Sequence, residues 1–183
     1  MTMQTINEIV PSNEDFKNSL YNYQNELTAK LDNLDTNFDQ KIINEIVLWK
    51  VNRYANIENE TLELINRIKK SDTEINPELT GQILLILLSK EQKGFRLAMA
   101  STVLRFKNPN IYQIIDQRVY RFLYGQELKY KENDLNEQIL IYMNYLNKLR
   151  QVCKEYSIDF AIADRVFYSM DKIYNPEEKL NGY

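Results

Sequence analysis

The residues best suited to carry chemistry lie in one stretch, KGFRLAMASTVLRFKNPNIYQIIDQRVYRF, which runs from Lys93 to Phe122. It predicts a tight turn at Gly94, a helix with small residues on one face, and an aspartate, Asp116, at the start of another helix. The first turn of a helix has unpaired backbone N–H groups and attracts anions such as phosphate. A fixed carboxylate stabilises positive charge that develops during a reaction and orients a water molecule. The stretch therefore combines a candidate phosphate contact with a candidate catalytic acid.

The chain has no histidine and a single cysteine, Cys153. The lack of histidine excludes Ser-His-Asp and Cys-His catalysis and histidine-ligated metals. One cysteine excludes an internal disulfide and any four-cysteine zinc or iron–sulfur site. Acid–base chemistry must therefore come from Asp, Glu, Lys or Tyr, and we expect no cofactor and no metal. Cys153 itself is expected to be a small buried hydrophobe.

The arrangement resembles the helix-hairpin-helix superfamily of base-excision DNA glycosylases. That family has a Leu-Pro-Gly-Val-Gly hairpin, an apolar helix, and then a Val-Asp-Thr-His-Val-x-Arg motif. Here Gly94 matches the first hairpin glycine, residues 98–104 match the second helix, and residues 115–121 match the aspartate motif. The family's lysine position falls on Ala98, eighteen residues before Asp116, so the spacing agrees without a gap. The resemblance implies that Asp116 is catalytic.

Three departures from the family pattern narrow what the resemblance implies. Gln92 and Lys93 replace the leading Leu-Pro of the hairpin, and Arg96 replaces its second glycine. Ala98 stands where bifunctional members have the lysine that forms a Schiff base. The resemblance therefore implies a hydrolytic, monofunctional enzyme or a non-catalytic relative. The four-cysteine cluster of some members is also absent, so no iron–sulfur cluster is expected.

The resemblance further implies duplex DNA as the partner. The residues expected to contact DNA are Lys93, Gly94, Arg96, Arg118 and Arg121. A target base must leave the stack before its glycosidic bond is broken, and it then enters a pocket with aromatic walls. The candidates for this base pocket are Trp49, Lys50, Arg53, Tyr54, Tyr112 and Tyr120.

Each of these assignments has a simpler structural alternative. An aspartate that begins a helix, such as Asp116, is commonly an N-cap. Lys50 and Arg53 lie three residues apart and could form a solvated edge beside a core Trp49 instead of a phosphate contact. The small face of residues 98–101 could serve close helix packing alone. Four residues near the C-terminus could also lie near the site, and these are Arg150, Lys154, Asp164 and Arg165.

Apolar periodicity and turn signals predict a chain of helices. The expected ranges are approximately 13–34, 38–54, 59–70, 77–89, 95–106, 116–125, 134–156 and 160–173, with a frayed tail over 174–183. The helix over 79–89 is apolar nearly all round and is expected to be the most buried. The helix-hairpin-helix would occupy approximately 79–107. We expect a single all-α domain over 1–183, or two closely packed lobes, with about eight helices.

The composition of the chain also favours an all-α fold. The chain of 183 residues is 44% hydrophobic and 27% charged and has four glycines and four prolines, which favours helices over tight β turns. The net charge of −3 argues against a general nucleic-acid affinity, but residues 90–130 hold eight basic and three acidic residues. The N-terminus lacks the pattern of a secretory signal, and no apolar run is long enough for a membrane span. We therefore expect a bacterial cytoplasmic protein without a membrane partner.

Two functions from different classes follow. The first is a DNA glycosylase for base excision repair or defence, which flips a modified base and hydrolyses its N-glycosidic bond with Asp116. The alternative is an inactive helical DNA-binding or protein-interaction module of the same fold, in which Asp116 only caps a helix. A weaker third possibility is a helical regulator whose basic centre contacts an acidic partner.

Overall fold

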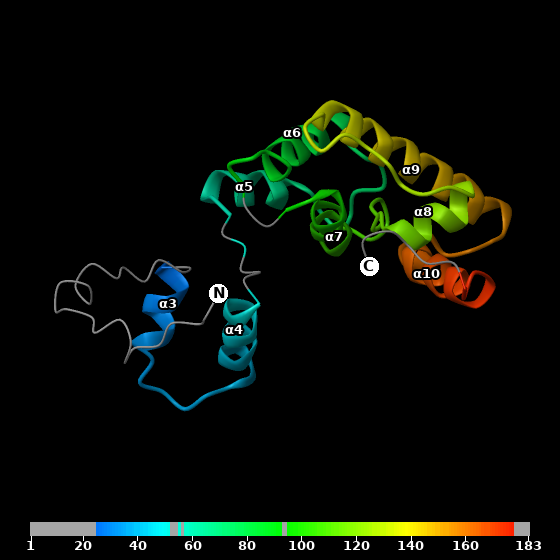
Figure 1. Cartoon of the computed structure of the whole chain (residues 1–183). Coiled ribbons are helices and arrows are strands. Elements are labelled where there is room, and N and C mark those ends of the chain that lie inside the picture. The colour runs from blue at the N-terminus through cyan, green and yellow to red at the C-terminus, as the bar shows by residue number, and fades with distance from the viewer. Residues whose placement is uncertain (1–24, 52–54, 56, 93–94, 178–183) are drawn as a thin grey trace, which may run out of the picture. The chain divides into compact units, whose positions relative to one another are not determined.

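A computed structural model describes residues 25–51, 55, 57–92 and 95–177 of the chain. Over these residues it contains eight α-helices, one short 3-10 helix and no β-strand, which confirms the predicted all-α fold (Figure 1). The chain divides into two compact units, residues 1–54 and residues 55–183. The expectation of one domain or two packed lobes stays a prediction, and each unit is described by itself.

The first unit holds the two described helices α3 (Asn25–Asp32) and α4 (Gln40–Lys50), which contact each other. Two side-chain contacts join them. The indole Nε1 of Trp49 donates a hydrogen bond to Oγ1 of Thr28 at 2.8 Å, and Lys30 pairs with Glu45 at 2.7 Å. The predicted helix over 13–34 is seen from residue 25 onward, since residues 1–24 lie outside the described part.

The second unit contains the remaining helices. They are α5 (Asn59–Arg67), α6 (Pro77–Leu87), α7 (Leu97–Lys107), α8 (Gln117–Tyr124), α9 (Leu135–Glu155), the 3-10 helix η1 (Phe160–Ile162) and α10 (Ala163–Tyr174). In Figure 1 the long helix α9 runs along one side of this unit, from α6 at one end toward α8 at the other. The predicted last helix is divided into η1 and α10, and the predicted tail is helical at Tyr174 and is described as far as Glu177.

The ends of several helices are set by local capping that the sequence already indicates. The side chains of Asn76, Asp116 and Asp134 each accept a hydrogen bond from a backbone N–H three residues later, at 3.0, 2.8 and 2.9 Å. Pro77 occupies the first turn of α6, where the missing N–H costs nothing. Gly125 ends α8 in a left-handed conformation with φ of 68°, which glycine adopts without steric strain.

A single apolar core holds the second unit together. Its members come from every α-helix of the unit and from the connection after α7, and the fully buried ones include Ile83, Leu84, Leu87, Leu97, Leu104, Ile111, Ile115, Leu146 and Leu149. The core face of α6 is buried, as predicted. Leu85 of the same helix is 42% exposed, however, so α6 is not buried all round. Cys153 is buried in this core, as expected.

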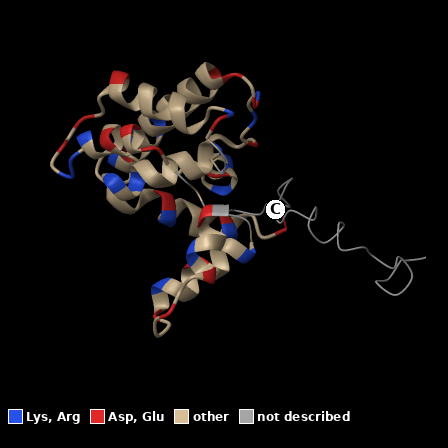
Figure 2. Ribbon diagram, turned by 90° about the vertical axis from the view of Figure 1, so that its left-hand side faces the viewer, with Lys and Arg blue, Asp and Glu red and all other residues tan. Residues whose placement is uncertain are grey.

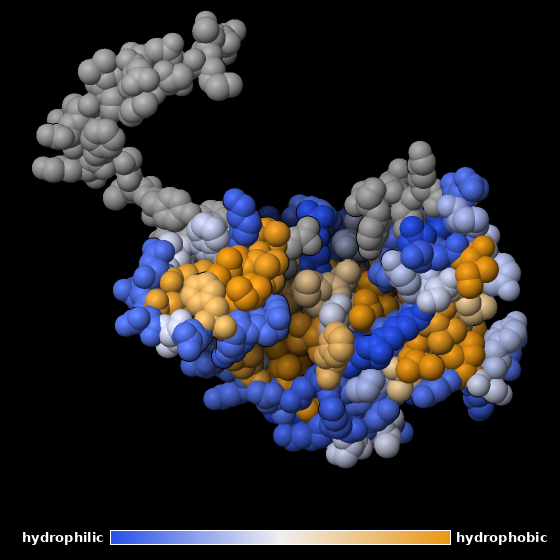
Figure 3. Space-filling model, turned by 90° about the horizontal axis from the view of Figure 1, so that it is seen from below, coloured by the Kyte–Doolittle hydropathy of each residue, from blue (hydrophilic) through white to orange (hydrophobic). Residues whose placement is uncertain are grey.

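Charge and apolar surface are both dispersed. Lys and Arg residues lie interspersed with Asp and Glu residues over the helices (Figure 2). The face shown in Figure 3 has separate apolar areas with hydrophilic residues between them. Within the described part of the chain, none of the helices combines the length and the apolar character that a membrane span requires.

The connection between α7 and α8 enters the core, and Asn108 fixes its first turn. The side chain of Asn108 is fully buried, and its Nδ2 donates to the carbonyl oxygens of Lys69 and Asp72 at 2.7 and 2.9 Å. Its Oδ1 accepts from the backbone N–H of Asn110 at 2.9 Å. One amide therefore joins the connection after α7 to the connection between α5 and α6.

We expect Asn108→Ala to lower the free energy of unfolding by about 2–3 kcal/mol, because two buried carbonyl oxygens lose their donor. Urea denaturation followed by circular dichroism measures this difference. Asn110→Ala is the matched control, because this side chain is exposed and makes one long contact of 3.4 Å with Lys70. Equal stabilities of the two variants would contradict the structural role given to Asn108.

Candidate functional site

Asp116 lies at the N-terminus of α8 with its carboxylate half-buried. One carboxylate oxygen accepts a hydrogen bond from the backbone N–H of Val119 at 2.8 Å. The structure therefore gives Asp116 the N-cap role that the sequence offered as the simpler alternative. The cap does not exclude chemistry, because it fixes the carboxylate in one orientation and leaves it partly exposed.

The surroundings of Asp116 favour its protonated form. Burial is the main cause that raises the pKa of this carboxyl above its usual range, and the negative charge of Asp164 acts in the same direction. The backbone N–H groups of Val119 and Arg118 and the charge of Arg118 act in the opposite direction. A carboxyl whose pKa is shifted by burial and by a neighbouring charge is a candidate for a functional role.

Side chains from three helices hold the backbone just before Asp116. Ser101 of α7 accepts from the N–H of Ile115 at 3.2 Å. Two tyrosines of α9 donate to the neighbouring carbonyl oxygens, Tyr145 to Ile114 at 2.6 Å and Tyr142 to Gln113 at 3.1 Å. Their buried hydroxyls have pKa values well above the usual range because of burial, so they act as permanent donors.

Asp164 of α10 contributes to the same arrangement from the other side. Its side chain is buried and accepts from the backbone N–H of Ile114 at 3.4 Å, while its own N–H donates to the Gln113 side chain at 3.3 Å. The buried Arg105 of α7 lies with its Nε 3.6 Å from this carboxylate, and its Nη2 donates to the carbonyl oxygen of Ala161 at 3.0 Å. Asp164 thus lies near the site, as one alternative suggested, and it fixes the backbone that precedes Asp116.

The two arginines of α8 converge on a second buried acid, Asp171 of α10. Arg118 donates to Asp171 at 3.1 Å, and Arg121 makes two bonds to it at 3.0 and 2.7 Å. Burial disfavours the charged form of Asp171, but the hydrogen bonds from Arg121, Asn175 and Arg118 outweigh burial and lower its pKa. Both arginines were predicted to contact DNA; here the pair binds α10 to α8, and 26% of the Arg118 side chain stays exposed.

The predicted hairpin lies between α6 and α7. Lys93 and Gly94 fall outside the described residues. Arg96 immediately precedes α7 without a capping side-chain bond, and its exposed guanidinium lies 3.6 Å from the equally exposed Glu132. A surface pair of this kind contributes little to stability and leaves the guanidinium accessible to an anion. Ala98 is exposed in the first turn of α7.

Two of the candidates for a base pocket, Tyr112 and Tyr120, lie in the described part of the second unit. Tyr112 is 1% exposed, and its hydroxyl lies 2.6 Å from Oγ1 of Thr80, so little of its ring is available to a ligand. Tyr120 is half-buried and stacks on Tyr124 with ring centres 4.4 Å apart. Trp49 and Lys50 belong to the first unit, which is described separately, and Arg53 and Tyr54 fall outside the described residues.

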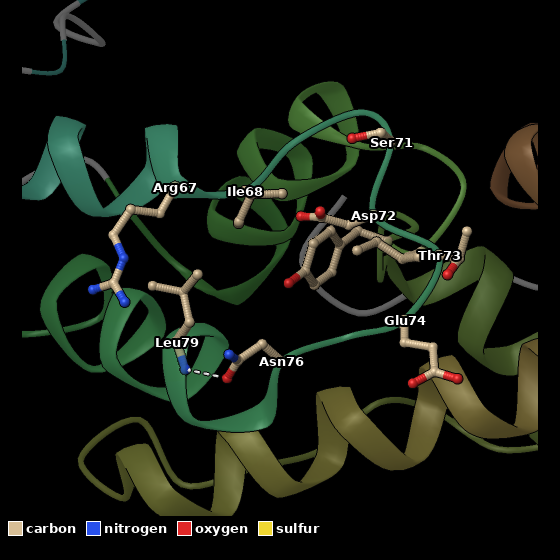
Figure 4. Close-up of a pocket in the computed structure, with 10 residues that line it drawn as sticks. Arg67, Ile68, Ser71, Asp72, Thr73, Glu74, Asn76 and Leu79 are labelled. Carbon is tan, nitrogen blue, oxygen red and sulfur yellow. Dashed lines mark hydrogen bonds between the residues drawn. The ribbon is translucent and has the colours of Figure 1, made fainter.

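A separate hollow of about 520 Å³ opens beside the connection between α5 and α6 (Figure 4). Its lining includes Arg67, Asp72, Glu74 and Asn76, together with the largely buried Tyr112. One basic and two acidic side chains give it no strong preference for an anion. Among the described residues predicted to contact DNA, neither Arg96 nor the two arginines of α8 line this hollow.

Sequence reasoning missed Asp171 and the tyrosine pair of α9. Asp171 and Arg121 are fifty residues apart, and a single sequence offers no signal for such a contact. An aspartate in the middle of an apolar helix face was the one available hint, because an acid is rarely fully buried without a partner. Within the described residues, no cluster of His, Cys, Asp and Glu side chains is suited to a metal ion.

No protein-family model, curated protein or solved structure shows significant similarity to this chain. The interpretation of the site therefore rests on its geometry and on the residues that carry the resemblance to DNA glycosylases.

We expect Asp171→Asn to lower the free energy of unfolding by about 3 kcal/mol at neutral pH, since it leaves two largely buried guanidinium groups without a carboxylate. The loss should shrink as the pH falls below about 4, because a carboxyl with a lowered pKa stabilises the fold above its unfolded pKa and loses this effect on protonation. Urea denaturation at several pH values measures both effects. Asp159→Asn, at an exposed cap before η1, is the control and should change little.

Proposed function

We propose that this protein is a hydrolytic DNA glycosylase in which Asp116 is the catalytic carboxylate. The observation that carries the proposal is the fixed, half-buried Asp116 at the start of α8, preceded by a backbone that Ser101, Tyr145 and Asp164 hold in place. A charge that is oriented before the substrate arrives needs no reorganisation during the reaction, which makes it effective in stabilising a transition state.

The proposed reaction breaks the bond between C1′ of the sugar and the base nitrogen. The base leaves with the electron pair of that bond, and positive charge develops on the sugar ring, where the carboxylate of Asp116 stabilises it. A water molecule then adds its oxygen to C1′ and loses a proton to Asp116 or to solvent, and the departed base takes up one proton from solvent. The products are a free base and an abasic site. The exposed Ala98 offers no amine at the position of the Schiff-base lysine, so strand cleavage by a lyase step is not expected.

A second candidate is a DNA-binding module of the same fold without catalysis. One observation favours it: Asp116 already serves as the cap of α8. In this case Asp116 would contribute to stability alone. The two candidates differ in whether any base is released.

Asp116→Asn separates them, because asparagine keeps the N-cap and removes the charge. We expect this variant to fold and to lose at least 100-fold in base release, the scale of removing one preorganised transition-state contact. The assay is alkali-labile strand cleavage of duplexes that carry a panel of modified bases. Asp134→Asn, which changes the equivalent cap of α9, is the matched control and should retain full activity. Base release that is the same in both variants would remove Asp116 from the mechanism.

The pH profile gives a further check on the same carboxylate. Only ionised Asp116 can stabilise the positive sugar, and burial raises the pKa of this group. Activity should therefore fall on acidification at a pH above the value of about 3.9 for an unperturbed aspartate. The free energy of unfolding should depend on pH in the opposite sense to that expected for Asp171. As the pH rises through the raised pKa of Asp116, wild type should lose stability relative to Asp116→Asn.

Duplex affinity tests the hairpin independently of chemistry. We expect Arg96→Ala to weaken binding of a short duplex several-fold and to reduce the salt slope by about one, as for the loss of one phosphate contact. Fluorescence anisotropy over a range of salt concentrations measures both quantities. Glu132→Ala removes the acidic neighbour of Arg96 and should leave affinity equal or higher. Unchanged binding in Arg96→Ala would exclude this residue from the interface.

A further inference from the structure

The helices α8 and α10 bury their acids, and α10 exposes its cations Arg165 and Lys172. Together they carry Arg118, Arg121, Arg165 and Lys172 and the two acids Asp164 and Asp171. Both acids are at most 3% exposed, and each is paired with an arginine, Asp164 with Arg105 of α7 and Asp171 with the arginines of α8. The solvent-facing charges contributed by these two helices are therefore positive, although the whole chain has a net charge of −3.

Two cations lie close to one aromatic ring, that of Tyr168. The guanidinium carbon of Arg118 lies 5.9 Å from the ring centre, and Nζ of Lys172 lies 5.8 Å from it. Arg165 precedes Tyr168 by three residues and Lys172 follows it by four, so all three lie on one face of α10. Tyr168 is 39% exposed, and Arg165 and Lys172 are exposed as well. We call Arg118, Arg165, Tyr168 and Lys172 the cation–tyrosine patch.

The patch adjoins Asp116 through Arg118. Arg118 is in the first turn of α8, two residues after the carboxylate, and its charge acts on the pKa of Asp116. It also contacts the Tyr168 ring. A ligand on the patch would therefore extend toward the candidate catalytic carboxylate.

We propose that the cation–tyrosine patch binds an unpaired segment of DNA, with phosphates at Arg165 and Lys172 and a base stacked on Tyr168. An exposed aromatic ring among cations is the arrangement by which proteins bind single strands without sequence preference. Arg165 and Lys172 are about 10 Å apart along the helix axis, so they can contact separate phosphates. A base stacked within a duplex has no free face, which is why the proposal specifies an unpaired segment. The choice of DNA rests on the proposed glycosylase function, in which a nucleotide leaves the duplex.

The test is fluorescence anisotropy of a labelled single-stranded oligodeoxythymidylate with the full chain at low salt. We expect salt-dependent binding by wild type, about tenfold weaker binding by the double variant Arg165→Ala/Lys172→Ala, and a smaller salt slope for that variant. Tyr168→Ala should weaken binding about tenfold, whereas Tyr168→Phe should bind as wild type does, because stacking needs the ring and not the hydroxyl. The control is Lys148→Ala/Lys154→Ala, a pair of exposed lysines on α9.

Three results would overturn the proposal. The first is the absence of oligonucleotide binding by wild type, and the second is equal oligonucleotide affinity of the patch variants and the α9 control. The third is that polyglutamate competes as well as unlabelled oligonucleotide does while Tyr168→Ala leaves the affinity unchanged, which would assign the patch to an acidic protein. Failure of the proposal for the cation–tyrosine patch can be distinguished from failure of the glycosylase proposal, because the oligonucleotide assay measures binding and needs no base release. Asp116→Asn should bind the oligonucleotide as wild type does, even though it releases no base.

Discussion

The second unit depends on one requirement: the connection between α7 and α8 lies in the core, and its backbone groups need hydrogen-bond partners there. Burial of a backbone group without a partner costs as much as a lost hydrogen bond. Regular secondary structure supplies no partners at this point, so side chains supply them. Asn108 fixes the first turn, and Ser101, Tyr142, Tyr145 and Asp164 bind the residues before Asp116.

This requirement links the fold to the candidate site. The residues that satisfy the connection come from α7, α9 and α10, so these helices must pack correctly before Asp116 takes its orientation. The same polar groups set the electrostatics. Asp164 binds the N–H of Ile114, and its charge also acts on the pKa of Asp116. Replacement of Asp164 would therefore disturb both the backbone before Asp116 and the acidity of the candidate catalytic group.

The sequence allowed the helices to be predicted well, because the signals for them are local. Asn76-Pro77, Asp116, Gly125 and Asp134 mark helix ends through contacts within a few residues, and the observed ends lie close to the predicted ones. The site could be predicted only in part. Asp116 was found from its position and spacing, but its partners Asp164 and Tyr145 depend on how distant helices pack. The ion pairs of Arg118 and Arg121 with Asp171 were missed for the same reason.

The position of Asp164 and Asp171 along the chain has a consequence for synthesis. Chains emerge from the ribosome from the N-terminus onward, and domains fold as units once their parts are available. The helices α5 to α9 are synthesised before the acids of α10 that pair with Arg105, Arg118 and Arg121. At this stage the nascent chain has three arginines that lack their carboxylate partners. The connection between α7 and α8 also lacks the hydrogen bond that Asp164 supplies. The unit therefore completes its polar interior only when α10 arrives, and the surroundings of Asp116 are among the last to form.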